Sequence, residues 1–92
     1  MSREKSWTFL SNHGHVMIQL HQNPDLKVKE LAEIVGITER STQSILGDLE
    51  EAGYITVTRN GRRNTYKVNQ NSKFRHPSES NKSVGLLLKI FS

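Results

Sequence analysis

Apolar residues recur at helical spacing in three successive segments of the first half of the chain. The spacing predicts helices over residues 12–22, 29–35 and 39–52, the first capped by Ser11 or Asn12 and the third by Thr38. Pro24 prevents the first helix from continuing, and Gly36 is expected to end the second in a left-handed conformation. The residues predicted to face inward are Val16, Met17, Leu20, Leu31, Ile34, Val35, Ile45, Leu46, Leu49 and Ala52.

After residue 53 the helical period gives way to strict alternation. Residues 54–59 and 62–68 are predicted as two strands around Asn60-Gly61, the strongest short signal for a two-residue hairpin turn. This turn predicts a register that pairs Arg59 with Arg62, Val57 with Asn64 and Ile55 with Tyr66. One face of the hairpin then carries Ile55, Val57, Tyr66 and Val68, an agreement that a slip of one residue would destroy.

The last quarter of the chain is predicted as a polar loop and a short helix. Residues 69–83 are polar and contain Pro77, whereas residues 84–91 carry one apolar stripe at 84, 87, 88 and 91 and a second at 86 and 90. A helix that is apolar on two sides needs two surfaces to pack against. We therefore divide the 92 residues into one domain over 1–68 and, over 69–92, a linker and terminal helix.

Charge is divided unevenly along the chain, although the net charge is only +4. Residues 29–51 hold two basic and six acidic side chains, whereas residues 59–82 hold seven basic side chains and one acid. A basic patch on an otherwise acidic body indicates an anionic partner. A solvated surface that keeps the protein dispersed is the simpler alternative.

Three helices followed by a hairpin resemble a known DNA-binding family. A short helix, a turn with glycine and a longer helix are typical of the helix-turn-helix, here VKELAEIVGITERSTQSILGDLEEAGYI. Together with GRRNTYKV, this run is similar to the winged helix-turn-helix domains of bacterial and archaeal transcription regulators of the MarR kind. The resemblance implies an α+β, mainly α fold: a three-helix core, a β-hairpin wing and an additional C-terminal helix.

The residue types on the third helix and the hairpin fit that resemblance. Opposed arginines at a hairpin tip repel each other, unless phosphates neutralise them. Arginine, glutamine and serine on the first half of a recognition helix suit base edges in a major groove. An exposed basic tip that only discourages edge pairing is the alternative. The predicted DNA-binding residues are Lys29, Thr38, Arg40, Ser41, Thr42, Gln43, Ser44, Arg59, Asn60, Arg62 and Arg63. Thr38 and Thr42 lie at the edge of the helix face, and capping and packing are the alternative roles for them.

Apolar residues at both ends of the chain predict a homodimer. They lie outside the usual three-helix core, and helix-turn-helix proteins commonly bind two half-sites as dimers. We expect the two ends to meet, and the second side of the terminal helix to pack against a partner chain. A terminal helix that only covers its own domain remains the alternative. The predicted interface residues are Trp7, Phe9, Leu10, Val84, Leu87, Leu88 and Phe91.

Several classes of function find no support in the sequence. The chain has no cysteine, and its four histidines lack the spacing of a metal site, so we expect no metal and no cofactor. No phosphate loop or nucleophile motif indicates an enzyme. No membrane segment or signal peptide is recognised, and a cytoplasmic location is expected. A winged helix that binds protein or RNA is the alternative function. A small-molecule effector between the domain and the terminal helix is a third alternative, which no sequence feature supports.

Overall fold

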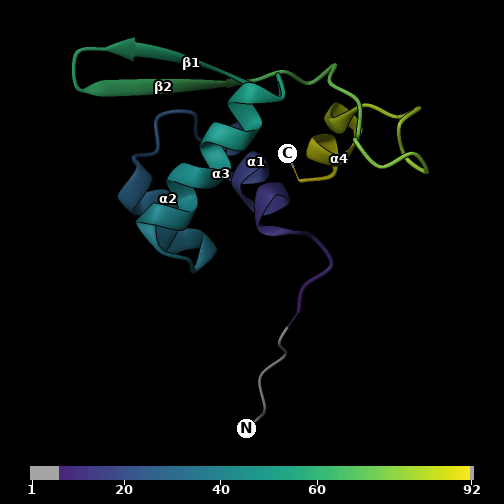
Figure 1. Cartoon of the computed structure of the whole chain (residues 1–92), viewed down its shortest axis with the longest axis horizontal. Coiled ribbons are helices and arrows are strands. Elements are labelled where there is room, and N and C mark those ends of the chain that lie inside the picture. Colours follow the sequence, from purple (N-terminus) through teal and green to yellow (C-terminus); the bar gives the residue numbers. More distant parts are fainter. Residues whose placement is uncertain (1–6, 92) are drawn as a thin grey trace, which may run out of the picture.

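The computed structural model describes residues 7–91 and confirms the predicted winged-helix architecture (Figure 1). Its elements are α1 (Asn12–Gln22), α2 (Val28–Val35), α3 (Glu39–Glu51), β1 (Ile55–Asn60), β2 (Arg63–Val68) and α4 (Val84–Ile90). The three helices pack together, and the hairpin extends from the end of α3 past α2. Within residues 7–91, no helix combines the length and apolar character that crossing a membrane requires.

Polar caps and one glycine set the helix ends where the sequence predicts them. The Ser11 hydroxyl accepts a hydrogen bond from the Gly14 amide at 3.2 Å, and Thr38 Oγ1 accepts one from the Ser41 amide at 3.0 Å. Gly36 ends α2 with φ 88°, a left-handed conformation that side chains with a β-carbon disfavour. These caps turn the chain sharply between α2 and α3, which sets the angle of the helix-turn-helix.

The core lies where α1, α2 and α3 meet the inner face of the hairpin, and two predicted core residues are absent from it. Ile34 is 53% exposed, because the buried stripe of α2 runs through positions 28, 31, 32 and 35 and leaves position 34 at its edge. Ala52 is exposed because α3 ends at Glu51. The buried apolar residues include Val16, Met17, Ile18, Leu20, Leu26, Leu31, Ile45, Leu46, Leu49, Ile55, Tyr66, Val84 and Leu88.

The hairpin register differs from the predicted one by two residues. Gly61 and Arg62 form the turn, so Arg59 pairs with Asn64 and Asn60 pairs with Arg63. Gly61 has φ 60°, and no non-glycine residue among 7–91 has positive φ. The turn is therefore of type II′, which has glycine at its first central position. The expected turn would have required Asn60 to be left-handed as well. The shift is even, so the predicted apolar face survives.

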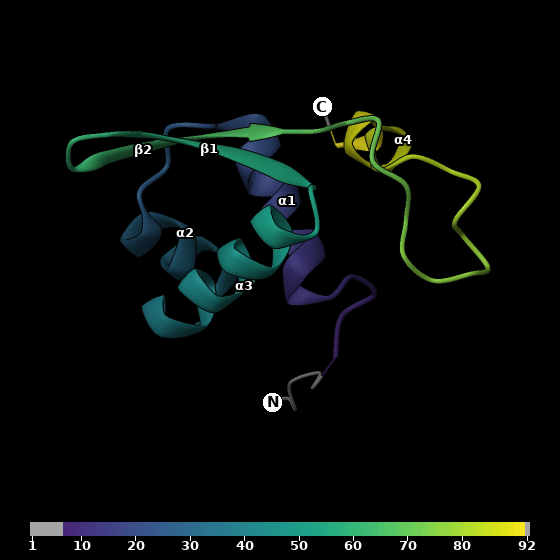
Figure 2. The ribbon, with the colours of Figure 1, turned by 45° about the horizontal axis from the view of Figure 1, so that its top comes forward.

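The segment 69–83 is an ordered strap that carries α4 back to the domain. The amides of Val84 and Gly85 donate to the carbonyls of Ser72 and Gln70 at 2.8 and 2.9 Å. The Tyr54 hydroxyl donates to the carbonyl of Lys73, which ties the strap to the end of α3. In Figure 2, α4 lies beyond the base of the hairpin, at the end opposite the tip, so the wing tip remains uncovered.

Candidate nucleic-acid interface

The first half of α3 presents a polar, uncovered face. Helical periodicity places Ile45, Leu46 and Leu49 in the core, and the opposite side therefore faces solvent. The side chains on that face can donate and accept hydrogen bonds, and they carry one positive charge. The exposed residues are Arg40, Ser41, Gln43, Ser44 and Gly47.

Both threonines predicted to touch DNA have structural roles, and Thr42 cannot reach a ligand. Thr42 has no exposed surface, because the i, i+3, i+4 spacing places it on the same stripe as Ile45 and Leu46. Its hydroxyl donates to the Thr38 carbonyl at 2.9 Å. Thr38 is exposed, but its hydroxyl caps α3 and donates to Ser41 Oγ at 3.0 Å. The prediction of Thr42 as a DNA contact is therefore wrong.

Two arginines at the hairpin tip have no acidic partner. Arg62 lies within the turn and Arg63 begins β2, and both are exposed. Among residues 7–91, no carboxylate pairs with either guanidinium. Asn60, also exposed, faces Arg63 across the turn. The tip therefore presents two uncompensated charges on a short, tight turn.

Arg59 behaves differently, which corrects the argument from opposed like charges. Its guanidinium donates to both carboxylate oxygens of Glu50, on the last turn of α3, at 3.2 and 3.4 Å. This hydrogen bonding and the negative charge of Glu50 raise the pKa of Arg59 above its ordinary value. Because Arg59 faces Asn64 and not Arg62, no repulsion between opposed arginines exists. Arg59 joins the wing to α3.

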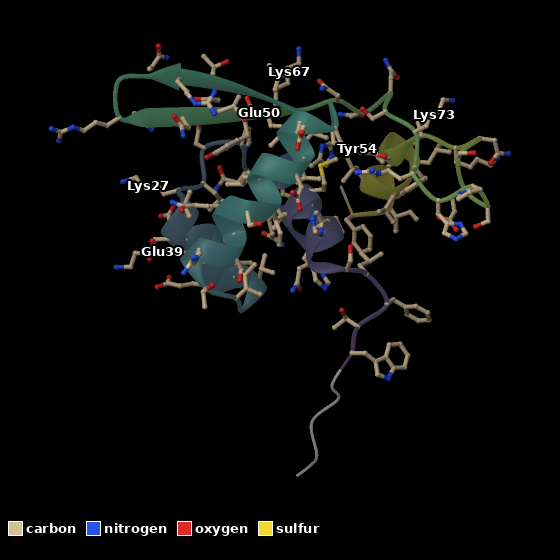
Figure 3. The ribbon with its side chains drawn as sticks, viewed as in Figure 1. Lys27, Glu39, Glu50, Tyr54, Lys67 and Lys73 are labelled. Carbon is tan, nitrogen blue, oxygen red and sulfur yellow. The ribbon has the colours of Figure 1, made fainter. Side chains whose placement is uncertain are left out.

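The amino end of α2 adds a basic group that the sequence reasoning missed. Lys27 is exposed, and Figure 3 shows it projecting to the same side of the molecule as Glu39, near the start of α3. Its amide donates to Glu30 Oε1 at 2.9 Å, which caps α2. Lys29, the predicted contact, is exposed two residues further on, in the first turn of α2. The position of Lys27 just before a helix could have indicated a phosphate contact, because helix N-termini attract anions.

The residues predicted to form the dimer interface occupy three different environments. Trp7 and Phe9 are 67% and 95% exposed, with their rings edge to face and their centroids 5.9 Å apart. Val84 and Leu88 are buried in the core of their own chain, so their prediction as partner contacts is wrong. The side of α4 that carries Val84 and Leu88 packs against the hydrophobic core of the domain.

The structure brings only some of the two ends together. Leu10 and Leu87 line the same groove, and both are half-buried. Phe91 lies at the far end of α1, where Gln22 Nε2 donates to its carbonyl at 2.7 Å. Phe9 lines the rim of the groove although it is 95% exposed, whereas Trp7 does not line the groove.

No described arrangement of side chains resembles a metal site. Within residues 7–91, no three histidine, aspartate or glutamate side chains are grouped closely enough to hold an ion. His13 Nε2 instead lies 2.9 Å from Asp48 Oδ2, which connects α1 to α3. The polar face of α3 and the basic tip are thus the features that suit a polyanion.

Comparisons with known proteins agree with this geometry. A family model described as winged helix-turn-helix DNA-binding matches residues 11–56, from the cap of α1 into β1. Among solved structures, the chain is similar to the zinc-dependent MarR family transcriptional regulator AdcR in its Zn(II)-bound state, with a TM-score of 0.51 and 17% identity. The match covers 75% of this chain and 49% of that regulator, so the chain spans about half its length.

A search of curated proteins gave no match. The family model nevertheless covers half of the chain, and the structural neighbour has the same fold. The chain belongs to the winged helix-turn-helix DNA-binding family, and its fold is that of a MarR-like regulator.

Proposed function

We propose that the protein is a sequence-specific double-stranded DNA-binding transcription regulator that works in the cytoplasm as a homodimer. One observation carries the proposal: the exposed hydrogen-bonding face of α3 accompanies a hairpin tip whose Arg62 and Arg63 have no acidic partner within residues 7–91. A DNA duplex supplies both base edges for the helix and phosphates for the tip. No enzymatic activity is proposed.

Each part of the interface has a distinct role in this proposal. The first half of α3 enters the major groove, where Arg40 suits guanine and Gln43 suits adenine, while Ser41 and Ser44 suit bases or phosphate. Arg62 and Arg63 bind phosphates or a narrow minor groove beside it. Lys27 and Lys29 meet the backbone at the start of α2, where the helix dipole also attracts phosphate.

The wing arginines provide the direct test. Arg62→Ala and Arg63→Ala should weaken binding to every duplex and lower the slope of log affinity against log salt by about 0.9 for each lost phosphate contact. The measurement is a titration of duplex DNA at several salt concentrations. Lys89→Ala is the matched control, because Lys89 is an exposed cation on α4, far from the tip.

Two outcomes would contradict the proposal. Wing variants with the affinity and slope of the wild type would remove the tip from the interface. Negligible affinity of the wild type for any duplex, even at low salt, would favour a winged helix that binds protein or RNA.

A further inference from the structure

A large groove lies on the side of the domain away from the wing tip. It has a volume of about 850 Å³ and runs between α1, the end of α3, the strap and α4. Met17 and Leu49 form its floor, and Leu10, Phe74 and Leu87 form apolar walls. Its edge is polar, with Asp48 and Glu51 from α3 and Arg75 from the strap. An open groove with an apolar floor is a candidate docking surface.

The same chain carries two aromatic side chains that its own domain leaves exposed. We call residues 7–10 the arm. Phe9 is 95% exposed and Trp7 is 67% exposed, and their rings contact each other edge to face. In Figure 1 this segment, which precedes α1, leaves the body of the molecule. Two large aromatic side chains displayed in this way are typical of a binding surface.

The arm lies at the rim of the groove of its own chain and does not fill it, because Phe9 and Leu10 line the groove while Phe9 is 95% exposed. Thr8 Oγ1 donates to the Leu10 carbonyl and lies 3.1 Å from His15 Nε2. The α1 residues that line the groove are His13, Gly14 and Met17, and His15 is not among them. The arm is therefore fixed at the rim of the groove, with Trp7 outside the groove of its own chain and the ring of Phe9 exposed to another molecule.

We propose that the groove receives the arm of a second copy of this chain, in a reciprocal exchange. A tryptophan or phenylalanine ring buries about 150–250 Å², so the four rings of two arms would remove about 600–1,000 Å² from water. The surface of the two grooves adds to this area and brings the interface to about 1,000–1,400 Å², at the lower end of the range for specific stable interfaces. The exchange gives the proposed homodimer its contact surface and rests on that part of the proposed function.

The geometry also fixes how the two copies meet. Four extended residues span about 13 Å, so the arm reaches a partner only when the two α1 amino ends are close together. The two-fold axis then passes near residue 12 of each chain, and each arm lies in the partner's groove. The exposed side of α4, with Leu86 and Ile90, is not required for this contact.

Trp7 is the only tryptophan of the chain and reports directly on the exchange. Light scattering and tryptophan fluorescence are recorded on the wild type from low to high micromolar concentration. We expect a dimer to form with concentration, and the emission maximum to move to shorter wavelength over the same range as the ring leaves water. A monomer at all concentrations overturns the proposal, as does a dimer whose emission stays that of an exposed ring. A monomer with short-wavelength emission throughout places the arm in its own groove and also overturns it.

Cysteine pairing locates the arm, because the chain has no native cysteine. Thr8→Cys lies between the two rings and leaves both intact, and Ala52→Cys lies exposed in the groove. An equimolar mixture of the two variants should form a disulfide-linked heterodimer on mild oxidation, which only contact between chains allows. A mixture in which Gln43→Cys replaces Ala52→Cys is the control, because Gln43 is exposed on the side of α3 opposite Ala52 and does not line the groove. Equal yields from both mixtures would overturn the proposal.

Paired truncations separate this interface from one on α4. Trp7→Ala should raise the dimer dissociation constant about tenfold or more, since a large ring at an interface centre carries much of the affinity. Ile90→Ala removes a side chain that is similarly exposed, at 73%, and should leave dissociation unchanged. The reverse pattern overturns the exchange. DNA titration of both variants distinguishes the two proposals. A dimer without affinity for DNA contradicts only the proposed function, whereas a monomer that binds DNA contradicts only the exchange.

Discussion

Three arginines of the wing are close in sequence but differ in their partners. Glu50 holds Arg59 against the end of α3, whereas Arg62 and Arg63 pair with no acid of residues 7–91. A charge that an acid already neutralises releases few counterions when DNA binds. Arg59 therefore serves to position the wing relative to α3, and the two arginines beyond it are available to phosphates.

This difference predicts that substitutions of Arg59 and of Glu50 change the salt slope of DNA binding differently. Arg59→Ala should leave the salt slope of DNA binding unchanged, because the charge it removes is already paired with Glu50. Glu50→Gln should steepen the slope by about 0.9, because it frees the Arg59 guanidinium for a phosphate. Duplex titrations over a range of salt measure both. Glu51→Gln removes the same charge from the next residue, which has no arginine partner among residues 7–91, and serves as the control. A shallower slope for Arg59→Ala would contradict the assignment.

The position of Arg59 also shows what a sequence pattern leaves open. Alternation predicted which strand residues face the core, and that prediction holds because the actual register differs by an even number of residues. Asn60-Gly61 suits a turn with both residues in its centre, but it equally suits a turn in which Gly61 comes first. Only the second keeps asparagine out of the left-handed region. The hairpin was therefore predictable, whereas the partner of Arg59 was not.

Among the elements, α3 was predicted best because its periodicity is strong. The exposed side that carries Arg40, Gln43 and Ser44 follows directly from the buried positions 45, 46 and 49. Thr42 was misplaced because its polarity suggested an outward direction, whereas its place in the stripe and a hydrogen bond to Thr38 satisfy it inside. The strap was missed because its order comes from backbone hydrogen bonds, which leave no hydrophobic period.

Two helical glycines should respond oppositely to alanine. A β-carbon at Gly47 meets nothing within 4 Å, so Gly47→Ala should stabilise the free protein by about 1 kcal/mol through helix propensity. A β-carbon at Gly85 would lie 2.8 Å from the Gln70 carbonyl oxygen, so Gly85→Ala should destabilise by about 1–3 kcal/mol as α4 separates from the strap. Urea unfolding measures the change in the free energy of unfolding for both variants, and each variant serves as the control for the other. A stabilised Gly85→Ala would show that α4 does not depend on this contact.

At the scale of the molecule, the two ends of the domain have different chemistry. The wing tip is basic and the first half of α3 is polar, whereas the floor of the groove and the arm at the other side are apolar. A polyanion and an apolar partner can therefore bind at the same time without competing for surface. A dimer joined through the arms leaves both α3 faces uncovered, which is the arrangement that a regulator with two half-sites requires.

The shape of such a dimer predicts the form of its operator. Two α3 helices related by a two-fold axis read the same bases on opposite strands, so selection from a random duplex pool should return an inverted repeat. Its half-sites should be about 10–10.5 base pairs apart, or a multiple of that, so that both major grooves face the protein. Trp7→Ala, below the concentration at which it dimerises, should bind one half-site with about half the salt slope of the wild type, because half of the phosphate contacts are lost. Ile90→Ala should bind the full repeat like the wild type. Recovery of a single asymmetric site, bound equally by wild type and Trp7→Ala, would mean that one copy reads DNA alone and that the arms serve another purpose.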